Sequence, residues 1–582
     1  MRVRRGVWLV LILIVLAVAV SAAGVVLLYS AVGREPQVTS GSTLVLRVGG
    51  DLAEVAPGGV LGQFIEAAPT VRSVVDALRK AKVDRRITSV ILEPAAPAAL
   101  WGKVQEVRDA ILDFRQSGKP VVAYLESGDQ QEFYLSTACD KVFLMPTASL
   151  DLTGLASYDV FLRGMLDKIG AYPDGMHIGA YKTALNEFTE HTYTPAHREM
   201  AESLNHDLFD QLVRGIADGR HKSEADVRAM IDHGPYLAPD AVKAGLVDDL
   251  AYEDQIDDKV KLGTGPVHRI DFDAYRRVST QSVGLDKGPR IAVVYAVGLI
   301  SSGKSSYDSL QGQVIGSDTL IGYLRDARAD ASIKAIVLRI DSPGGSALAS
   351  DVIWREVQLT KSRKPLIVSM GDVAASGGYY IAMPAQAIVA EPSTLTGSIG
   401  VVITKFVVDG TLQKLGINLE GVSEGKYADM NSPVKPFSPD ERASVARTMQ
   451  ATYDTFVEKA AQGRNTTPER IDAVGQGRVW TGRQAKQIGL VDELGGLQRA
   501  IAIAKQRAKI PQDSGVELVI YPPRPSFYDL FRKPFGSSDR AASLAAAMLG
   551  LRDPHAVQQL AAPLTLFRRT EPLALMPEVF VN

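Results

Sequence analysis

Ser376 is the residue whose surroundings point most directly to nucleophilic chemistry. It lies in the segment MGDVAASGGYY, residues 370–380, after an apolar run typical of a buried strand and before a run compatible with a helix. A serine at a tight strand-to-helix turn exposes its hydroxyl, and the helix N-terminus that follows stabilises negative charge. The segment therefore indicates a nucleophilic serine, although an ordinary βα turn also uses glycine and serine.

Two glycines follow another apolar run upstream of that serine. Gly344 and Gly345 end the segment DSPGG, residues 341–345. Paired glycines allow backbone N–H groups to approach a bound oxyanion closely. The pair is thus a candidate oxyanion hole, while a plain turn remains the alternative.

A serine nucleophile needs a base, and the histidines are badly placed to supply one. None of the eight lies between residues 269 and 554: they are His177, His191, His197, His206, His221, His233, His268 and His555. Lysine is the next candidate, but a pKa near 10.4 leaves only about four molecules in ten thousand neutral at pH 7. A lysine base must therefore be desolvated in a buried site, or set beside positive dipoles.

The chain contains an internal repeat that bears on which lysine this is. SVILEPAAPAA from Ser89 matches AIVLRIDSPGG from Ala335 at an offset of 246 residues, and GAYK, residues 179–182, faces GKYA, residues 425–428, at the same offset. AVKAGLVD, residues 241–248, matches AKQIGLVD, residues 485–492, at a slightly shorter one. Matches in one order at nearly one spacing predict a duplicated domain.

The two copies differ at the residues that could do chemistry. The first copy has Lys182 where the second has Ala428, and it has Gln130 or Gln131 where the second has Ser376. It also has two alanines, residues 98 and 99, in place of the glycine pair. We expect one composite site, formed within one chain or between two neighbouring chains, with a base from the first domain and a nucleophile and oxyanion hole from the second. The alternative is drift in a structural duplication, with Lys182 solvated on the surface.

Short β-branched runs alternate with amphipathic stretches in each copy. In the second copy we expect strands over Ile291–Val297, Ala335–Ile340 and Pro365–Met370, and helices over Ala349–Lys361 and Gly377–Met383. Such alternation predicts βα units on a buried, mostly parallel sheet, which is an α/β fold.

An apolar segment near the N-terminus predicts a membrane anchor. No charged residue lies between Arg5 and Arg34, and the stretch from Val7 to Leu28 is long enough to cross a hydrocarbon core of about 30 Å. Three arginines before it favour a cytoplasmic N-terminus, with the rest of the chain on the far side. A cleaved signal peptide is the alternative, because small residues at 17–23 could support processing.

Composition excludes several classes of protein. A chain of 582 residues with 46% hydrophobic and 22% charged residues is a multidomain globular protein, too long for one core. With a net charge of −2, the chain lacks the excess of basic residues that a nucleic-acid binder needs. A single cysteine, Cys139, excludes an intramolecular disulfide and a zinc site of several thiolates. We interpret it as a small buried core residue rather than a thiol nucleophile.

These observations divide the chain into six segments. We expect a cytoplasmic N-terminus, a transmembrane anchor, a first domain that supplies the lysine, a connecting segment, a second domain that supplies the serine, and an unassigned tail. Their boundaries are residues 1–6, 7–29, 40–255, 256–288, 289–511 and 512–582.

Four motifs together resemble the signal peptide peptidase A group of peptidase family S49, in its long, duplicated, membrane-anchored form. They are DSPGG at 341–345, AASGGYY at 374–380, PSTLTGSIG at 392–400 and GAYK at 179–182, and the resemblance covers roughly residues 40–510. It implies a tandem duplication of a ClpP/crotonase-like domain, preceded by one transmembrane helix, and a serine endopeptidase with a Ser-Lys dyad.

The resemblance also assigns roles to individual residues. It implies Ser376 as nucleophile, Lys182 as general base, Ser398 as the hydroxyl that orients the lysine, and an oxyanion hole made by Gly377, Gly344 and Gly345. It implies no cofactor and no metal. The expected substrates are hydrophobic peptides, namely cleaved signal peptides, and the expected assembly is a homotetramer in the bacterial inner membrane with its catalytic domains on the periplasmic side.

Three competing interpretations remain. GLISSGKS, residues 298–305, fits the P-loop pattern after a strand, but the glycine- and serine-rich continuation lacks the helix that such a loop needs. A crotonase-like acyl-thioester enzyme would share the fold without requiring both Ser376 and Lys182. A non-catalytic membrane scaffold would tolerate the loss of either residue.

Overall fold

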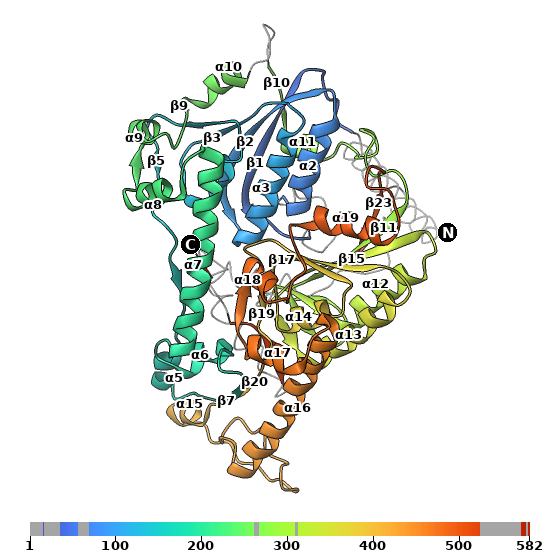
Figure 1. The fold of residues 1–582 in the computed structure, drawn as a ribbon. Helices are drawn as coiled ribbons and strands as arrows, with labels where there is room; N and C mark the ends of the chain where they lie inside the picture. Colours follow the sequence, from blue (N-terminus) through green and yellow to red (C-terminus); the bar gives the residue numbers. More distant parts are fainter. Residues whose placement is uncertain are drawn as a thin grey trace, which may run out of the picture.

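A computed structural model describes residues 35–55, 69–260, 267–308, 312–523, 572–577 and 580–581, together with Leu16 (Figure 1). The predicted anchor, residues 7–29, lies outside these ranges except for Leu16. Among the residues described, no helix has the length and apolar character required to cross a membrane.

The first copy is built on a six-stranded parallel sheet. The strand order is β10-β1-β2-β3-β4-β9, and every neighbouring pair is parallel. Helices α2, α3 and α4 connect or follow its strands, as the βα alternation predicted. The bounds are β1 Ser42–Asp51, α2 Val71–Val83, β2 Ile87–Ala98, α3 Trp101–Arg115, β3 Val121–Leu125, α4 Gln130–Ser136, β4 Lys141–Leu144, β9 Asp249–Leu250 and β10 His268–Asp271.

The second copy repeats this sheet around the predicted nucleophile. Its strand order is β21-β19-β17-β15-β11-β23, β18 pairs with β17, and β22 pairs with β18. All of these pairs are parallel except β19 with β21. The expected strands and helices are confirmed as β11 Arg290–Val297, β15 Ile333–Ser342, α13 Ala347–Lys361, β17 Leu366–Ala375 and α14 Gly377–Ala382. The others are β18 Ala387–Ala390, β19 Leu395–Gly397, β21 Val479–Thr481, β22 Glu493–Leu494 and β23 Glu517–Tyr521.

Both copies carry a long helix of the same length in the same place. Helices α7, Pro195–Arg220, and α16, Pro439–Arg464, each have 26 residues. Thr194 and Ser438 cap their N-termini through the side-chain oxygen, and each helix has proline in its first turn. Shared start signals at matching positions show that the duplication extends to the helical framework.

A third sheet joins the two copies and the end of the chain. Its order is β13-β14-β12-β16-β24-β20-β7, with β7 at Tyr172–Ile178, β12 at Leu299–Ser301, β13 at Ser306–Asp308, β14 at Gly312–Gly316, β16 at Gly344–Ser346, β20 at Val401–Val407 and β24 at Leu573–Leu575. Strand β7 of the first copy runs antiparallel to β20 of the second over their whole length. This pairing fixes the first copy against the second.

Buried ion pairs hold the same interface. Arg339 of β15 is fully buried and donates to Glu54 at 2.6 and 2.9 Å and to Glu106 of α3 at 2.6 Å. Lys103 of α3 lies 2.8 Å from Asp341. A buried charge that loses its partner is strongly destabilising, so the two copies cannot separate without a large cost.

Short elements complete the described fold. They are β5 Ser149–Leu150, β6 Ser157–Tyr158, α5 Arg163–Ile169, η2 Thr183–Leu185, α6 Asn186–Thr189, α8 Glu224–Asp232, β8 Tyr236–Leu237, α9 Ala238–Lys243, η3 Glu253–Gln255, α10 Ile256–Val260, α11 Phe272–Tyr275, α12 Ser317–Ala329, α15 Asp409–Lys414, α17 Pro468–Val474, α18 Gly482–Gln487, α19 Leu497–Arg507 and β25 Phe580–Val581.

Candidate active site

Three predicted site residues from distant parts of the chain meet at one point. The amine Nζ of Lys182 lies 2.7 Å from Ser376 Oγ, 2.9 Å from Ser398 Oγ and 2.8 Å from the Ser398 carbonyl oxygen. All three residues have no solvent-exposed surface. The lysine comes from the first copy and both serines from the second, within one chain.

Strand β7 positions Lys182 against the second copy. The chain leaves β7 at Ile178, and the Tyr181 N–H then donates to the carbonyl of Gln476 at 2.8 Å. A Cβ on Gly477 would lie 2.5 Å from the Lys182 backbone, and one on Gly400 would lie 2.9 Å from Lys182 Cδ. Glycine is thus required where the second copy packs against the lysine.

Ser376 occupies a sharp turn between β17 and α14. Its φ is +54°, a left-handed conformation that is costly for a residue with a side chain. The turn is held because the Ser376 N–H donates to the Gly397 carbonyl at 2.8 Å and its own carbonyl accepts from Tyr380 N–H at 2.8 Å. The hydroxyl therefore projects from a fixed backbone, as the strand-to-helix pattern predicted.

Ser398 has the same unusual backbone conformation, with φ at +54°. It follows β19, and its N–H donates to the carbonyl of Arg478 at 2.7 Å. This geometry presents both the carbonyl oxygen and the hydroxyl of one residue to the lysine amine.

Burial favours the neutral form of Lys182. Desolvation lowers the pKa of Lys182 well below its ordinary value of 10.5. A neutral amine has two N–H groups and one lone pair. If its N–H groups are donated to the Ser398 carbonyl and hydroxyl, the lone pair faces the Ser376 hydroxyl, which is the arrangement of a general base with its nucleophile.

The predicted oxyanion glycines lie together next to Ser376. Gly344 and Gly345 have φ of +107° and +148°. A Cβ on Gly377 would lie 3.1 Å from both Gly344 Cα and the Gly345 nitrogen. The Gly344 N–H donates to Ser342 Oγ over 3.2 Å, a long bond that an oxyanion would have to replace. The backbone N–H groups of these glycines can thus approach the oxyanion of a reacting carbonyl. A side chain at any of the three positions would prevent this approach.

Sequence reasoning missed two groups of residues at this site. Gly477 lies in a Gly-Gln-Gly turn at 475–477, whose composition signals a turn and no chemistry. The second group is an apolar cluster beside Ser376, in which Leu395, Val479, Met200, Leu204 and Met576 pack with Ala375. Its members are scattered over the whole chain, so no local pattern marks them.

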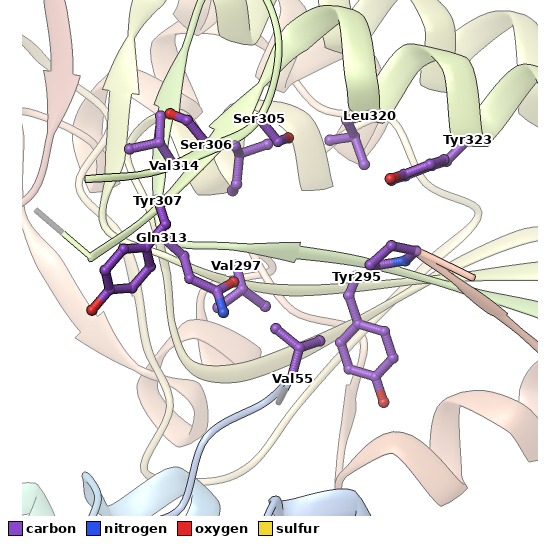
Figure 2. A pocket seen from close by; sticks show the side chains of 12 residues that line it. Val55, Tyr295, Val297, Ser305, Ser306, Tyr307, Gln313, Val314, Leu320 and Tyr323 are labelled. Atoms are coloured by element: carbon purple, nitrogen blue, oxygen red, sulfur yellow. The ribbon is translucent and has the colours of Figure 1, made fainter. Parts of the chain in front are cut away.

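The P-loop-like segment has no helix where a phosphate site needs one. Strand β12 lies inside the pattern at 298–305, and the next helix, α12, begins at Ser317. Ser305 lines a separate cavity of about 240 Å³ whose walls include Tyr295, Gln313 and Tyr323 (Figure 2). None of Lys182, Ser376 and Ser398 lines it.

The only cysteine is a core residue. Cys139 is buried in the main cluster of the first copy, and burial raises the pKa of its thiol. A thiol that resists ionisation is a poor nucleophile. The expected structural role of Cys139 agrees with this environment.

Comparison with known proteins gives the family. The sequence model of "Peptidase family S49" matches residues 113–265 and 358–511, one match in each copy. The chain is 38% identical over 490 residues to "Serine protease SPPA, chloroplastic" of Arabidopsis thaliana, covering 83% of this chain and 72% of that protein. It is 34% identical over 534 residues to "Protease 4" of Salmonella typhi, covering 88% and 85%.

A shorter relative matches part of the chain. "Putative signal peptide peptidase SppA" of Enterococcus faecium is 33% identical over 195 residues, which cover 33% of this chain and 57% of that protein. The two family matches and the two mostly parallel sheets confirm the predicted tandem duplication of an α/β domain. The family model matches more than half of the chain, and the Arabidopsis thaliana and Salmonella typhi relatives align with most of it. The chain therefore belongs to peptidase family S49 and is a serine peptidase.

Proposed function

We propose that this peptidase is a membrane-anchored endopeptidase that uses a Ser376–Lys182 dyad to degrade signal peptides left after the release of secreted proteins. The observation that carries the dyad is the 2.7 Å contact between Lys182 Nζ and Ser376 Oγ in a site closed to solvent. Burial lowers the pKa of Lys182 and so favours the neutral amine, which is the form a base requires.

The reaction follows from this geometry. Lys182 takes the proton of Ser376 Oγ as that oxygen attacks a peptide carbonyl, and the oxyanion is stabilised by backbone N–H groups at Gly377 and the Gly344–Gly345 turn. The lysine then gives its proton to the leaving amine. A water molecule, activated by the same lysine, hydrolyses the acyl-enzyme and restores the serine.

The surroundings of the nucleophile favour apolar peptides. Ala375 precedes the nucleophile and belongs to the apolar cluster with Leu395, Val479, Met200 and Leu204. Signal peptides have an apolar core of 7–15 residues, which suits such walls. The printed name of the Enterococcus faecium relative, a putative signal peptide peptidase, supports the same substrate.

The location and assembly are part of the proposal. Residues 7–29 would anchor the chain in the bacterial inner membrane, with the catalytic domains on the periplasmic side, because the flanking arginines favour a cytoplasmic N-terminus. The family resemblance supports a homotetramer. Because Lys182 and Ser376 are in contact inside one chain, such an assembly is not needed to bring them together.

Family membership favours the peptidase over the two other functions considered. An acyl-thioester enzyme would bind coenzyme A and would not need both dyad residues. A scaffold would need neither. Coenzyme A binding by the purified chain would therefore argue for the thioester function.

The test is cleavage of a fluorogenic hydrophobic peptide by the full chain in detergent. We expect Ser376→Ala and Lys182→Ala each to abolish turnover, while Lys304→Ala, on an exposed part of the P-loop-like segment, retains it. Full activity of Lys182→Ala, or an inactive wild type across such peptides, would contradict the proposed function.

A further inference from the structure

Strand β17 contains a bulge shortly before Ser376. In the parallel pair of β15 and β17 the register shifts, so that Asp341 alone faces residues 371–373. Bulges bend a strand and re-aim the side chains that follow, and they are frequent next to active sites. The direction in which β17 presents Ser376 therefore depends on how this bulge is held.

The bulge is also the place where β17 changes its outer neighbour. Residues 367–369 pair with β18, and residues 373–375 pair with β19. The last three residues before Ser376 thus follow a different strand from the rest of β17. The bulge joins the two parts, and any shift in it moves the end of the strand.

A lysine of the first copy lies at this bulge. Lys103 Nζ is 2.8 Å from Asp341 Oδ2 and 3.5 Å from Asp372 Oδ2. Asp341 Oδ1 accepts a hydrogen bond from the Val373 N–H at 3.0 Å. The three charged side chains are only 6–13% exposed, so salt screens their attraction little. The ammonium therefore joins a carboxylate of β15 to a carboxylate of β17 across the bulge.

The carboxylate of Asp372 also caps a helix of the first copy. It accepts from the Lys103 N–H at 2.7 Å and from the Leu100 N–H at 3.0 Å, at the start of α3. Leu100 provides no side-chain cap of its own. The matching helix of the second copy, α13, begins at the equivalent position and is capped by its own Ser346. The second copy thus supplies the N-cap that α3 lacks, and the helix N-terminus stabilises the negative charge.

Close packing restricts the geometry of this contact. Helix α3 and strand β17 lie side by side here (Figure 1). A Cβ on Gly102 would lie 3.1 Å from Asp372 Oδ1 and 3.2 Å from the Gly371 carbonyl oxygen. A Cβ on Gly371 would lie 2.9 Å from Glu54 Oε1 and 3.1 Å from Asp341 Cβ. Glycine on both sides therefore allows the helix to approach the bulge closely.

We propose that Lys103 is a positioning residue for peptide cleavage, because it holds Asp341 and Asp372 together at the bulge. This rests on the proposed function. Asp341 lies three residues before Gly344, in the segment that leads to the expected oxyanion hole. Asp372 lies four residues before Ser376, in the segment that leads to the expected nucleophile. The first copy thus supplies both the base and the support that aligns its two partners.

A positioning role and a purely structural role have different consequences. A structural ion pair changes the fraction of folded molecules and leaves the rate constant of each folded molecule unchanged. A positioning residue changes kcat in chains that are fully folded, because a misplacement of about 1 Å between reacting groups costs about 100-fold in rate.

The first experiment removes the ammonium in the full chain. Lys103→Met keeps an unbranched side chain and leaves two carboxylates without their shared cation. We expect kcat for a hydrophobic peptide to fall at least tenfold under conditions in which circular dichroism shows a folded chain. Lys103→Arg keeps the charge and should lose less than threefold. An unchanged kcat in Lys103→Met would overturn the proposal.

Arg220→Met is the matched control. Arg220 also belongs to the first copy, its side chain is 11% exposed, and it lies 2.9 Å from Asp248. Asp248 immediately precedes β9, at the edge of the first sheet. Arg220→Met therefore removes an ion pair of similar exposure outside the bulge and should keep the wild-type kcat. An equal fall in kcat in Lys103→Met and Arg220→Met would mean that loss of an ion pair alone explains the effect, and the proposal would be wrong.

Hydrogen exchange monitors the bulge without any turnover. The Val373 N–H is bonded to Asp341, which Lys103 holds. We expect proteolytic fragments covering residues 370–375 to take up deuterium faster in Lys103→Met than in the wild type or Arg220→Met. Unchanged uptake in Lys103→Met would overturn the proposal even if kcat fell. A wild-type chain that cleaves no peptide would overturn the proposed function, and faster uptake would then still assign Lys103 to holding the bulge.

Discussion

Lys182 Nζ lies 2.7 Å from Ser376 Oγ although 194 residues separate the two in the chain. The contact is produced by the antiparallel pairing of β7 with β20, which joins the first copy to the second. Each copy retains the fold and lacks one half of the dyad, so neither can perform the proposed reaction by itself.

The dyad within one chain predicts the result of a mixing experiment. Chains with Lys182→Ala retain the serine, and chains with Ser376→Ala retain the lysine. We expect equimolar mixtures of the two, refolded together or coexpressed, to show no more peptide cleavage than either alone. Recovery of about a quarter or more of wild-type activity would mean that the dyad also forms between chains.

Gly477 should be essential for the placement of the lysine. A Cβ in Gly477→Ala would lie 2.5 Å from the Lys182 backbone, and the residue has φ of +80°. We expect kcat/KM to fall at least 100-fold, because small displacements of a base cost that much. The matched control is Gly489→Ala, with φ of +85° and no atom within 4 Å of the added methyl. It carries the same backbone penalty and should retain activity.

Burial of Lys182 makes the stability of the fold depend on pH in a definite direction. Its pKa in the folded chain is lowered, so between that pKa and about 10.4 the unfolded state binds more protons. The free energy of unfolding therefore rises with pH by up to about 1.4 kcal/mol per unit relative to Lys182→Met, which has no such proton. Urea denaturation of both chains at several pH values measures the difference. If the free energy of unfolding changed with pH equally in the wild type and in Lys182→Met, Lys182 would be charged in the folded chain.

The same lowered pKa predicts the acid limb of the activity profile. We expect kcat/KM for an uncharged peptide to rise with pH through a single pKa far below 10.5, because only neutral lysine accepts the serine proton. Ser398→Ala removes one acceptor of a lysine N–H and should lower kcat at the plateau by about tenfold or more. An unchanged kcat in this variant would assign no orienting role to the Ser398 hydroxyl.

Local patterns predicted the elements around the nucleophile well. The run ending at Ala375, the turn at Ser376 and the glycine pair all depend on a few adjacent residues, so periodicity and turn chemistry were sufficient. The comparison of the two copies then singled out Lys182, because a functional residue present in one copy and absent from the other leaves an asymmetry that sequence alone displays.

Features made by long-range pairing could not be predicted in this way. The third sheet combines strands from residues 172–178, 299–316, 344–346, 401–407 and 573–575, and no local pattern states which edge will accept which strand. The role of Gly477 depends on the approach of the Lys182 backbone. Strand β24 is short and apolar, and its place in the sheet depends on packing partners from distant parts of the chain.

The position of β24 at the end of the chain sets an order of events during biosynthesis. A ribosome completes β16, β20, Ser376 and the Lys182 segment long before residues 572–577 emerge, because it builds the polypeptide from its N-terminus. Strands β16 and β20 are therefore complete before the strand that pairs with both of them exists. A translation product that stops short of Pro572 would contain every residue of the candidate site but not the strand that pairs with its glycines.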